Sequence, residues 1–343
     1  MKTLEHRLSA GRAGNGYNRI RLIAALLVLF SHAFPITGAV EPLERLGLDT
    51  SLGLLSVAAF FVISGVLISA SYERSQLARF VEKRVMRIMP ALAVSVLLCV
   101  FLLGPLLTRS PDYFSQGQTW AYLGRAVFFP TAHELPGLFA DHPNTAVNGS
   151  LWSLLYEVIC YVGVAMALCF RAKKLLVIGA WLMSFALARA IPEDAGGGLY
   201  YVRTLAELFR FFGAGMLLYL YRDRIPIRAD IGLGAALLVL AGAFTPVFEE
   251  VCAVAGSYAV IALAYLWKPL QSSSETDFSY GVYIYAFPVQ QAVYQLVGGN
   301  WAVNILVALP ITLGLAALSW YLVERPAMRL NWKAKAPALS PGH

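Results

Sequence analysis

Apolar residues in this chain form long, nearly uninterrupted stretches separated by short polar segments. Each stretch approaches the roughly 20 residues that a helix needs to cross a bilayer. The ten stretches lie at residues 19–36, 51–71, 90–108, 150–170, 175–190, 204–221, 230–246, 250–267, 278–297 and 301–323. We therefore predict an all-α integral membrane protein with about ten transmembrane helices. The apolar segment at 119–130 is too short to cross and is expected to lie along the interface or to re-enter.

Composition supports this class, because 58% of the 343 residues are hydrophobic and only 14% are charged, which excludes an ordinary soluble domain. Lysine and arginine give the orientation, since they accumulate in cytoplasmic loops. With both termini in the cytoplasm, 21 of the 27 Lys and Arg residues fall in predicted cytoplasmic segments. The others are Arg45, Arg109, Arg125, Arg189, Arg203 and Arg210. The net charge of +7 thus reflects membrane topology and not nucleic-acid binding.

The whole chain, residues 1–343, is expected to be a single transmembrane domain with a core at 17–326 and a cytoplasmic tail at 327–343. Signal-peptide cleavage near residue 39 would remove Arg21 and His32, so we interpret the first stretch as an uncleaved signal anchor. The four cysteines lie in predicted spans without CxxC spacing, so we expect apolar packing and no metal site. No motif predicts a permanently bound cofactor.

Arg21 and His32 mark one face of the first predicted span. Their spacing of eleven residues is close to three helical turns, which places His32 about 16 Å further along the same face. An ionisable group in the apolar part of a membrane helix is costly and usually faces a polar cavity or a partner. We therefore expect a cavity beside this helix. A neutral His32 that is hydrogen-bonded between helices is the alternative.

Residues 72–90 have the pattern of an amphipathic helix. We predict one cytoplasmic interfacial helix here, whose basic side in the commoner case faces anionic lipid. Arg84, however, falls in the apolar stripe with Leu77 and Val81, so it is expected to point toward protein. Arg84 and Arg87 lie three residues apart and form a fork suited to phosphate groups. This pattern fits a cytoplasmic phosphorylated ligand such as coenzyme A.

The fourth predicted span carries a carboxyl group on a polar face. Ser150, Ser153 and Glu157 share that face, because they are spaced at helical intervals. A carboxyl group at this depth is expensive unless it is neutral or partnered. Glu157 and His32 enter from opposite sides to comparable depths, so one interpretation is that Glu157 orients the His32 imidazole. The alternative is a structural ion pair between Glu157 and Arg210 of the sixth span.

Two other spans contain polar or small residues of interest. Ser64 and Gly65 lie near the middle of the second span, where small residues usually allow close helix packing and would also leave room for a ligand tunnel. In the ninth span, Tyr283 and Gln291 fall on one amphipathic stripe that could contact a sugar. Aromatic belt residues at the membrane interface explain the ends of this span equally well.

Taken together, these segments resemble the acyltransferase-3 family of bacterial multi-pass membrane proteins. Each piece is short, but six of them occur in order over nearly the whole chain. They are R-x10-H at Arg21 and His32, FFxxSG at 60–65, RxxR at Arg84 and Arg87, SLWSLxxE at 150–157, a segment at 279–285 that resembles the SYxxYLxH region, and ExP at 324–326. The resemblance implies ten core helices, a bacterial inner-membrane location in contact with lipid, and an acyl-CoA donor on the cytoplasmic side.

The chain departs from the family pattern at two positions. Asn18 stands where the family often has Asp, and Ala286 stands where many members have a second His, so the chemistry depends more heavily on His32. The chain also stops about twenty residues after its last predicted span, where some relatives carry a fused esterase-like domain. Any second step would then need a separate periplasmic partner.

The resemblance implies acylation, usually acetylation, of a hydroxyl on a cell-envelope or exported polysaccharide, or on its lipid-linked glycan precursor. In this interpretation His32 is the general base and Glu157 orients it. A covalent acyl-His32 intermediate stays open. The residues expected to hold the acetyl-CoA phosphates are Arg21, Arg84 and Arg87. The residues expected to contact the acceptor are Ser150, Trp152, Tyr283 and Gln291.

Two other classes of protein compete with this interpretation. A glycolipid or glycan transporter or flippase would also place polar groups near the membrane midplane. No inverted repeat or pair of broken helices is visible in the sequence, which argues against it. A non-catalytic scaffold would explain the topology but would not explain why the ionisable residues His32 and Glu157 lie within predicted spans.

Overall fold

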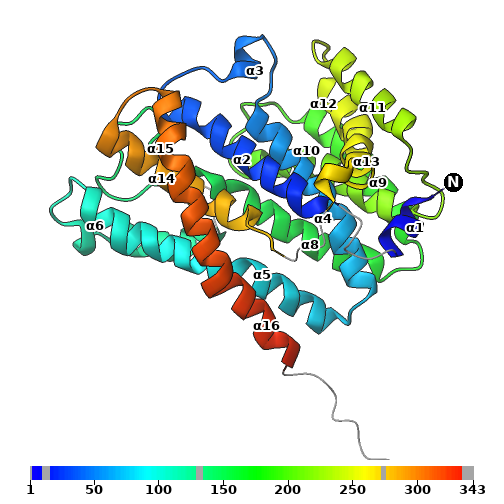
Figure 1. The fold of residues 1–343 in the computed structure, drawn as a ribbon, viewed down its shortest axis with the longest axis horizontal. Coiled ribbons are helices and arrows are strands. Elements are labelled where there is room, and N and C mark those ends of the chain that lie inside the picture. Colours follow the sequence, from blue (N-terminus) through cyan, green and yellow to red (C-terminus); the bar gives the residue numbers. More distant parts are fainter. Residues whose placement is uncertain (1, 10–15, 129–133, 272–275, 334–343) are drawn as a thin grey trace, which may run out of the picture.

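The computed structural model describes residues 2–9, 16–128, 134–271 and 276–333 (Figure 1). Over these residues the regular secondary structure is helical, apart from an isolated bridge between Thr3 and Pro226. The first half of the chain forms α1 (Leu4–Ser9), α2 (Tyr17–Ile36), α3 (Pro42–Arg45), α4 (Leu52–Glu73), α5 (Leu77–Leu98), α6 (Gly104–Leu107), α7 (Gly117–Phe128) and α8 (Trp152–Leu168). The second half forms α9 (Lys173–Ala190), α10 (Gly198–Leu220), α11 (Ala229–Gly242), α12 (Phe248–Val251), α13 (Ser257–Leu266), α14 (Ser279–Val297), α15 (Trp301–Ser319) and α16 (Arg325–Lys333). The predicted all-α class is confirmed for these residues.

Each of the ten apolar stretches coincides with a helix or with two helices joined end to end. Among the described residues, six helical segments are long and apolar enough to cross a membrane, and α11 is a shorter apolar helix. The six are Tyr17–Ile36, Leu52–Glu73, Leu77–Leu107, Gly149–Leu168, Phe248–Leu266 and Trp301–Arg329. The protein is therefore a multi-pass membrane protein. The count of ten spans and the cytoplasmic placement of both termini stay predictions.

The amphipathic segment at 72–90 does not form a separate interfacial helix, which corrects the prediction. α5 runs unbroken from Leu77 through Pro90 to Leu98, and continues through a π-helical turn into α6 (Figure 1). Pro90 removes only one backbone hydrogen bond. Ala91 and Leu92, directly after it, are buried, so their packing supports the helix across this position. The segment that begins with the basic residues is therefore the first part of a spanning helix.

α4 and α10 approach each other closely in the centre of the bundle. A Cβ atom added to Gly65 would lie 2.2 Å from the carbonyl oxygen of Phe212, and one added to Gly215 would lie 2.2 Å from that of Val62. No larger side chain fits at such a distance, so both glycines are required for the contact. The expectation of close packing at Gly65 is confirmed.

The bundle has two ends that are used as reference surfaces below. The terminal face is the end where α2 and α14 begin and where α4 ends. The loop face is the opposite end, which carries the connections at residues 37–51 and 134–151. α3 projects from the loop face, and α16 leaves the other side of the molecule (Figure 1). The charge count predicts that the terminal face is cytoplasmic.

Candidate active site

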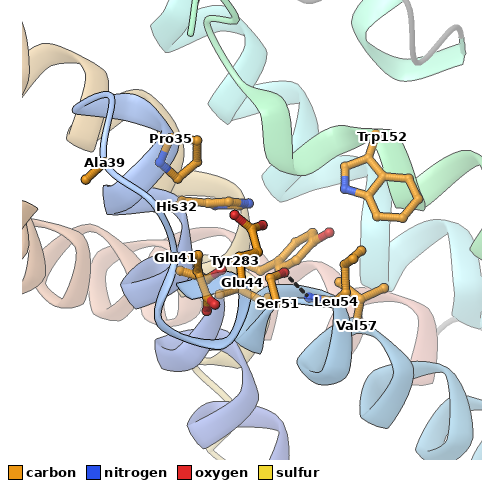
Figure 2. Close-up of a pocket in the computed structure, with 13 residues that line it drawn as sticks. His32, Pro35, Ala39, Glu41, Glu44, Ser51, Leu54, Val57, Trp152 and Tyr283 are labelled. Carbon is orange, nitrogen blue, oxygen red and sulfur yellow. Dashed lines mark hydrogen bonds between the residues drawn. The ribbon is translucent and has the colours of Figure 1, made fainter. Parts of the chain in front are cut away.

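His32 lines a cavity of about 160 Å³ near the loop face (Figure 2). The cavity is built from the adjoining ends of α2 and α4, the connection between them, and single residues of α8 and α14. Its lining residues are Val28, Ser31, His32, Pro35, Ala39, Glu41, Glu44, Ser51, Gly53, Leu54, Val57, Trp152 and Tyr283. The cavity expected beside the first span is therefore present, and it lies toward the loop face.

The His32 imidazole is not fixed by a hydrogen bond from Nδ1 to another helix in the described part of the chain. Its Nδ1 atom is buried and has no hydrogen-bond partner among the described residues. The ring packs edge-on against Phe287, with 5.0 Å between the two ring centroids. An imidazole held by apolar packing keeps this nitrogen free of a competing partner. This geometry does not match the alternative of a histidine that is hydrogen-bonded between helices.

The connection between α2 and α4 forms the outer wall of the cavity. Glu41 holds it in place, because its carboxylate accepts hydrogen bonds from the amides of Leu43, at 2.7 Å, and Leu52, at 2.8 Å. Ser51 caps α4 by accepting a hydrogen bond from the Leu54 amide at 3.1 Å. The sequence reasoning missed these residues. Glu41 directly before Pro42 is a typical start of a short helix, and this pattern could have indicated an ordered connection.

Two of the four predicted acceptor residues line this cavity. Trp152 opens α8 and presents its indole ring to the cavity, opposite His32 (Figure 2). The Tyr283 hydroxyl lies 2.8 Å from Ser153 Oγ, which fixes the phenol at the cavity wall. Ser150 does not line the cavity; its hydroxyl is buried and has no partner among the described residues.

Gln291 lies outside the cavity, so the geometry does not support its predicted contact with a sugar. Its side-chain nitrogen donates to the carbonyl oxygens of Asn144 and Ala146, both at 2.6 Å. Its side-chain oxygen lies 2.8 Å from Nδ1 of His142. A buried amide needs such partners, and the long connection before α8 supplies them. Gln291 therefore fastens that connection to α14.

Glu157 does not contact His32, which corrects the first interpretation of this carboxyl group. Its Oε1 atom accepts hydrogen bonds from the hydroxyls of Ser64, at 3.2 Å, and Tyr161, at 2.5 Å. The alternative is also wrong, because Arg210 pairs with Glu249 at 2.5 Å. Glu157 is thus held by two neutral donors.

The helix offsets explain the difference in depth between Glu157 and His32. A Cβ atom on Gly53 of α4 would lie 3.0 Å from the hydroxyl of Ser31, the neighbour of His32. Glu157 bonds Ser64 of α4, which lies eleven residues after Gly53 and therefore about 16 Å further along that helix. The sequence argument placed the start of α8 at the membrane boundary. In the structure the contact with Ser64 shows that α8 is displaced along α4, which carries Glu157 toward the terminal face.

A buried cluster of opposite charges lies at the terminal end of α2. Nη1 of Arg21 lies 2.8 Å from Oδ2 of Asp277, and Nη2 of Arg87 lies 2.5 Å from the same oxygen. Arg87 also reaches Glu324 at 3.4 Å, and Glu324 accepts a hydrogen bond from Ser319 at 3.0 Å. We call Arg21, Arg84, Arg87, Asp277 and Glu324 the arginine cluster. Asp277 precedes α14 and was missed, since nothing in its local sequence indicates a partner.

Asp277 is ionised in this cluster. Burial alone would raise its pKa, but the charges of Arg21 and Arg87 and the hydrogen bonds from Ser279 outweigh burial and lower the pKa to about 2. A permanent negative charge between two guanidinium groups fixes both of them. Arg21 and Arg87 are therefore oriented before any ligand binds.

Arg84 points into the protein, as predicted, but for a different reason. Leu77 and Val81 are exposed on the outer side of α5, so they do not form a protein-facing stripe. Arg84 lies instead on the inner side, with its guanidinium carbon 5.9 Å from the ring centroid of Tyr161. Its Nε atom is buried and has no hydrogen-bond partner among the described residues. Of the three predicted phosphate ligands, Arg84 alone has no ion pair with a carboxylate in the described part of the chain.

The site thus has two centres on one face of α2. The arginine cluster lies at the terminal end, and the cavity of His32 lies about 16 Å further along the helix, near the loop face. The first centre offers cations to an anionic ligand, and the second offers a base beside an aromatic ring.

Comparisons with known proteins agree with the motifs. A family model described as an acyltransferase domain matches residues 15–324. The chain belongs to the acyltransferase-3 family. The match confirms the resemblance inferred from the six motifs. Together with the apolar helices, it identifies the protein as a multi-pass membrane acyltransferase.

Two relatives match the acyltransferase over nearly its whole length. The O-acetyl transferase of Shigella phage Sf6 is 32% identical over 326 residues, which cover 91% of this chain and 95% of that protein. Nodulation protein 10 of Rhizobium leguminosarum bv. viciae is 30% identical over 364 residues, which cover 95% of this chain and 96% of that protein. No solved structure matches the chain.

Proposed function

We propose that this acyltransferase moves an acetyl group from acetyl-CoA, bound at the arginine cluster, to a sugar hydroxyl in the cavity of His32. The observation that carries the proposal is the position of His32. Its imidazole lines a cavity beside Trp152, its Nδ1 atom has no partner among the described residues, and it shares a helix face with Arg21. A base at one end of a helix face and arginines at its other end suit a donor such as acetyl-CoA, which has phosphates at one end and a thioester at the other.

The donor end of the proposal is supported by the guanidinium groups. Arg84 retains donors without an ion-pair partner among the described residues, and its planar fork suits a phosphate. Arg21 and Arg87 use only part of their five donors each on Asp277 and Glu324, so both keep capacity for phosphate oxygens. Glu157 bonds Tyr161, over which Arg84 lies, so we assign Glu157 to the positioning of Arg84 and not of His32.

The proposed chemistry is a direct transfer. His32 removes the proton from the acceptor hydroxyl as its oxygen attacks the carbonyl carbon of the thioester. The carbon–sulfur bond then breaks, an ester forms on the sugar, and coenzyme A leaves as a thiolate. The imidazolium returns the proton to this thiolate, which leaves His32 neutral for the next cycle.

The acceptor class is proposed from the cavity and from one relative. An indole ring opposite a polar wall suits the apolar face and the hydroxyls of a sugar. The relative from phage Sf6 is named an O-acetyl transferase, which favours acetyl as the group and oxygen as the acceptor atom. The charge count predicts a cytoplasmic arginine cluster and an outward-facing cavity of His32, and this prediction supports our proposal of an envelope or exported glycan at the inner membrane.

The proposal is tested by mass spectrometry of envelope and secreted polysaccharides from cells that express the wild-type enzyme, the His32→Ala variant or neither. Acetyl increments that appear only with the wild-type enzyme support an O-acetyltransferase and identify the acceptor. Equal acetylation in all three strains, with a change in the amount of exported glycan, would instead support a transporter. Transfer of label to the glycan by purified enzyme, supplied with acetyl-CoA labelled in the acetyl group, would identify acetyl-CoA as the donor.

A further inference from the structure

The wall of the cavity of His32 carries a charge that neither the motifs nor the family membership assigns. Two carboxylates, Glu41 and Glu44, are among its thirteen lining residues, and none of the thirteen is a lysine or arginine. Glu41 is fully buried and its two oxygens are bonded to backbone amides, so it is committed to the fold. Glu44 is exposed at the cavity, and its carboxylate makes no hydrogen bond or ion pair with the other described residues, so it faces whatever enters.

We propose that Glu44 makes this cavity selective for neutral or cationic acceptors and against acceptors that carry a carboxylate near the reacting hydroxyl. The inference rests on the proposed function for the identity of the acceptor, but the charge selectivity itself is a property of the cavity. Its consequence is that uronic acids and other acidic sugars are excluded, while neutral and amino sugars are admitted.

The connection that carries Glu44 is rigid enough to maintain this charge in place. Glu44 belongs to α3, whose first turn is bonded to Glu41, and Glu41 also bonds the first residue of α4. Gly38 and Gly47 flank α3 with φ angles of +72° and +82°, a backbone conformation that residues with a side chain rarely adopt. The backbone of α3 is therefore held at the cavity wall, which keeps Glu44 beside the cavity.

Electrostatics then decides between acceptors. A cavity of about 160 Å³ has room for no more than about one sugar residue, so an acidic substituent on the reacting residue would lie close to Glu44. Like charges at such short range repel, and the low-dielectric protein wall of the cavity strengthens this repulsion. Arg45 follows Glu44 but does not line the cavity, so it does not offset the repulsion. A hydroxyl or ammonium group, by contrast, can donate a hydrogen bond to Glu44.

The charge selectivity can be measured without knowledge of the acceptor. Ala39→Cys places a thiol in the cavity wall, and Cys169→Ser removes the one native cysteine that is exposed on the described chain. The thiol is modified by cationic trimethylammonioethyl methanethiosulfonate or by anionic sulfonatoethyl methanethiosulfonate. Each modification rate is divided by the rate at which the same reagent reacts with free mercaptoethanol. The ratio of the two normalised rates reports the potential at residue 39.

We expect this cation-to-anion ratio to fall by about fivefold or more when Glu44→Gln is added, because one elementary charge is removed close to the thiol. Glu44→Asp, which retains the charge, should preserve most of the ratio. Asp49→Asn is the matched control, since Asp49 is an exposed acid of the same connection that does not line the cavity. A ratio that changes equally for Asp49→Asn and Glu44→Gln, or for neither, overturns the proposal.

The consequence for the acceptor is tested with envelope glycans separated by anion exchange. With labelled acetyl-CoA, the wild-type enzyme should acetylate the neutral fraction, and Glu44→Gln should extend the label to the acidic fraction mainly through a lower acceptor KM. Preferential labelling of the acidic fraction by the wild-type enzyme overturns the selectivity. If the wild-type enzyme labels no fraction, the proposed function fails, and the thiol ratios still decide whether Glu44 sets the charge of the cavity.

Discussion

Arg21 and Asp277 are 256 residues apart in the sequence, yet Nη1 of Arg21 lies 2.8 Å from Oδ2 of Asp277. The same carboxylate oxygen bonds Arg87. Asp277 therefore joins the start of α2, the first half of α5 and the segment before α14 at one point. The pair orients two guanidinium groups of the proposed donor site and also contributes to the stability of the bundle.

Removal of the Asp277 charge should destabilise the protein. In Asp277→Asn, Arg21 and Arg87 lose their shared counter-ion in a buried site, where removal of one partner of an ion pair costs roughly 3–5 kcal/mol. The thermal unfolding midpoint of purified protein in detergent should fall clearly below that of the wild type. Asp49→Asn, at an exposed position, is the control. Equal midpoints for both variants and the wild type would falsify the structural role of Asp277.

The pKa of Asp277 predicts the pH dependence of this contribution. The pKa falls from about 4 in an unfolded chain to about 2 in the folded protein, so the ionised form is favoured by folding. A depressed pKa stabilises the fold above the unfolded value, and the stabilisation of about 2 kcal/mol is lost as the pH falls from about 4 to 2. The midpoint difference between wild type and Asp277→Asn should be constant near neutral pH and should shrink below about pH 4.

Arg84 and Arg87 should respond differently to substitution, although both belong to one motif. Arg84 has no carboxylate partner in the described residues, so Arg84→Ala should raise the KM for acetyl-CoA with little change in the unfolding midpoint. Arg87→Ala removes the ion-pair partner of Glu324 and one of the two guanidinium partners of Asp277, so it should lower the midpoint. Calorimetry with acetyl-CoA and thermal unfolding separate the two effects. Unchanged acetyl-CoA affinity in Arg84→Ala would remove Arg84 from the donor site.

His32 and Glu157 should affect different steps. His32→Ala should abolish transfer, with acetyl-CoA affinity and the unfolding midpoint near those of the wild type, because the imidazole is assigned to the proton and not to the phosphates. Glu157→Gln should raise the acetyl-CoA KM and leave the pH profile of kcat unchanged, since Glu157 lies with Tyr161 and Arg84. A shift in that pH profile in Glu157→Gln would mean that Glu157 acts on His32 after all.

The predicted orientation can be checked by labelling in intact cells. Ala140 is exposed on the loop face and Ala172 on the terminal face, so a cysteine at each position reports one side of the membrane. Both are placed in a Cys169→Ser background, because Cys169 is exposed. A membrane-impermeant thiol reagent should modify Ala140→Cys in intact cells and Ala172→Cys only after permeabilisation. The reverse pattern would invert the topology and place the donor site outside.

The sequence by itself determined the features that depend on spacing within one helix. Helical periodicity alone places Arg21 and His32 on the same face, and the structure puts a cavity beside His32. Hydropathy alone places a helix at each of the ten apolar stretches, because a helix satisfies its own backbone hydrogen bonds in a membrane. These relations need no knowledge of neighbouring helices.

Only the tertiary structure decided which polar groups meet. The contacts of Glu157 with Ser64 and Tyr161, and of Asp277 with Arg21, depend on how far each helix is displaced along its neighbour. That displacement is set by close packing between helices and by the depth at which each connection is buried, and neither is encoded in the spacing of residues along a single helix. A shift of a few residues along a helix exchanges one polar partner for another, because successive turns are only about 5 Å apart.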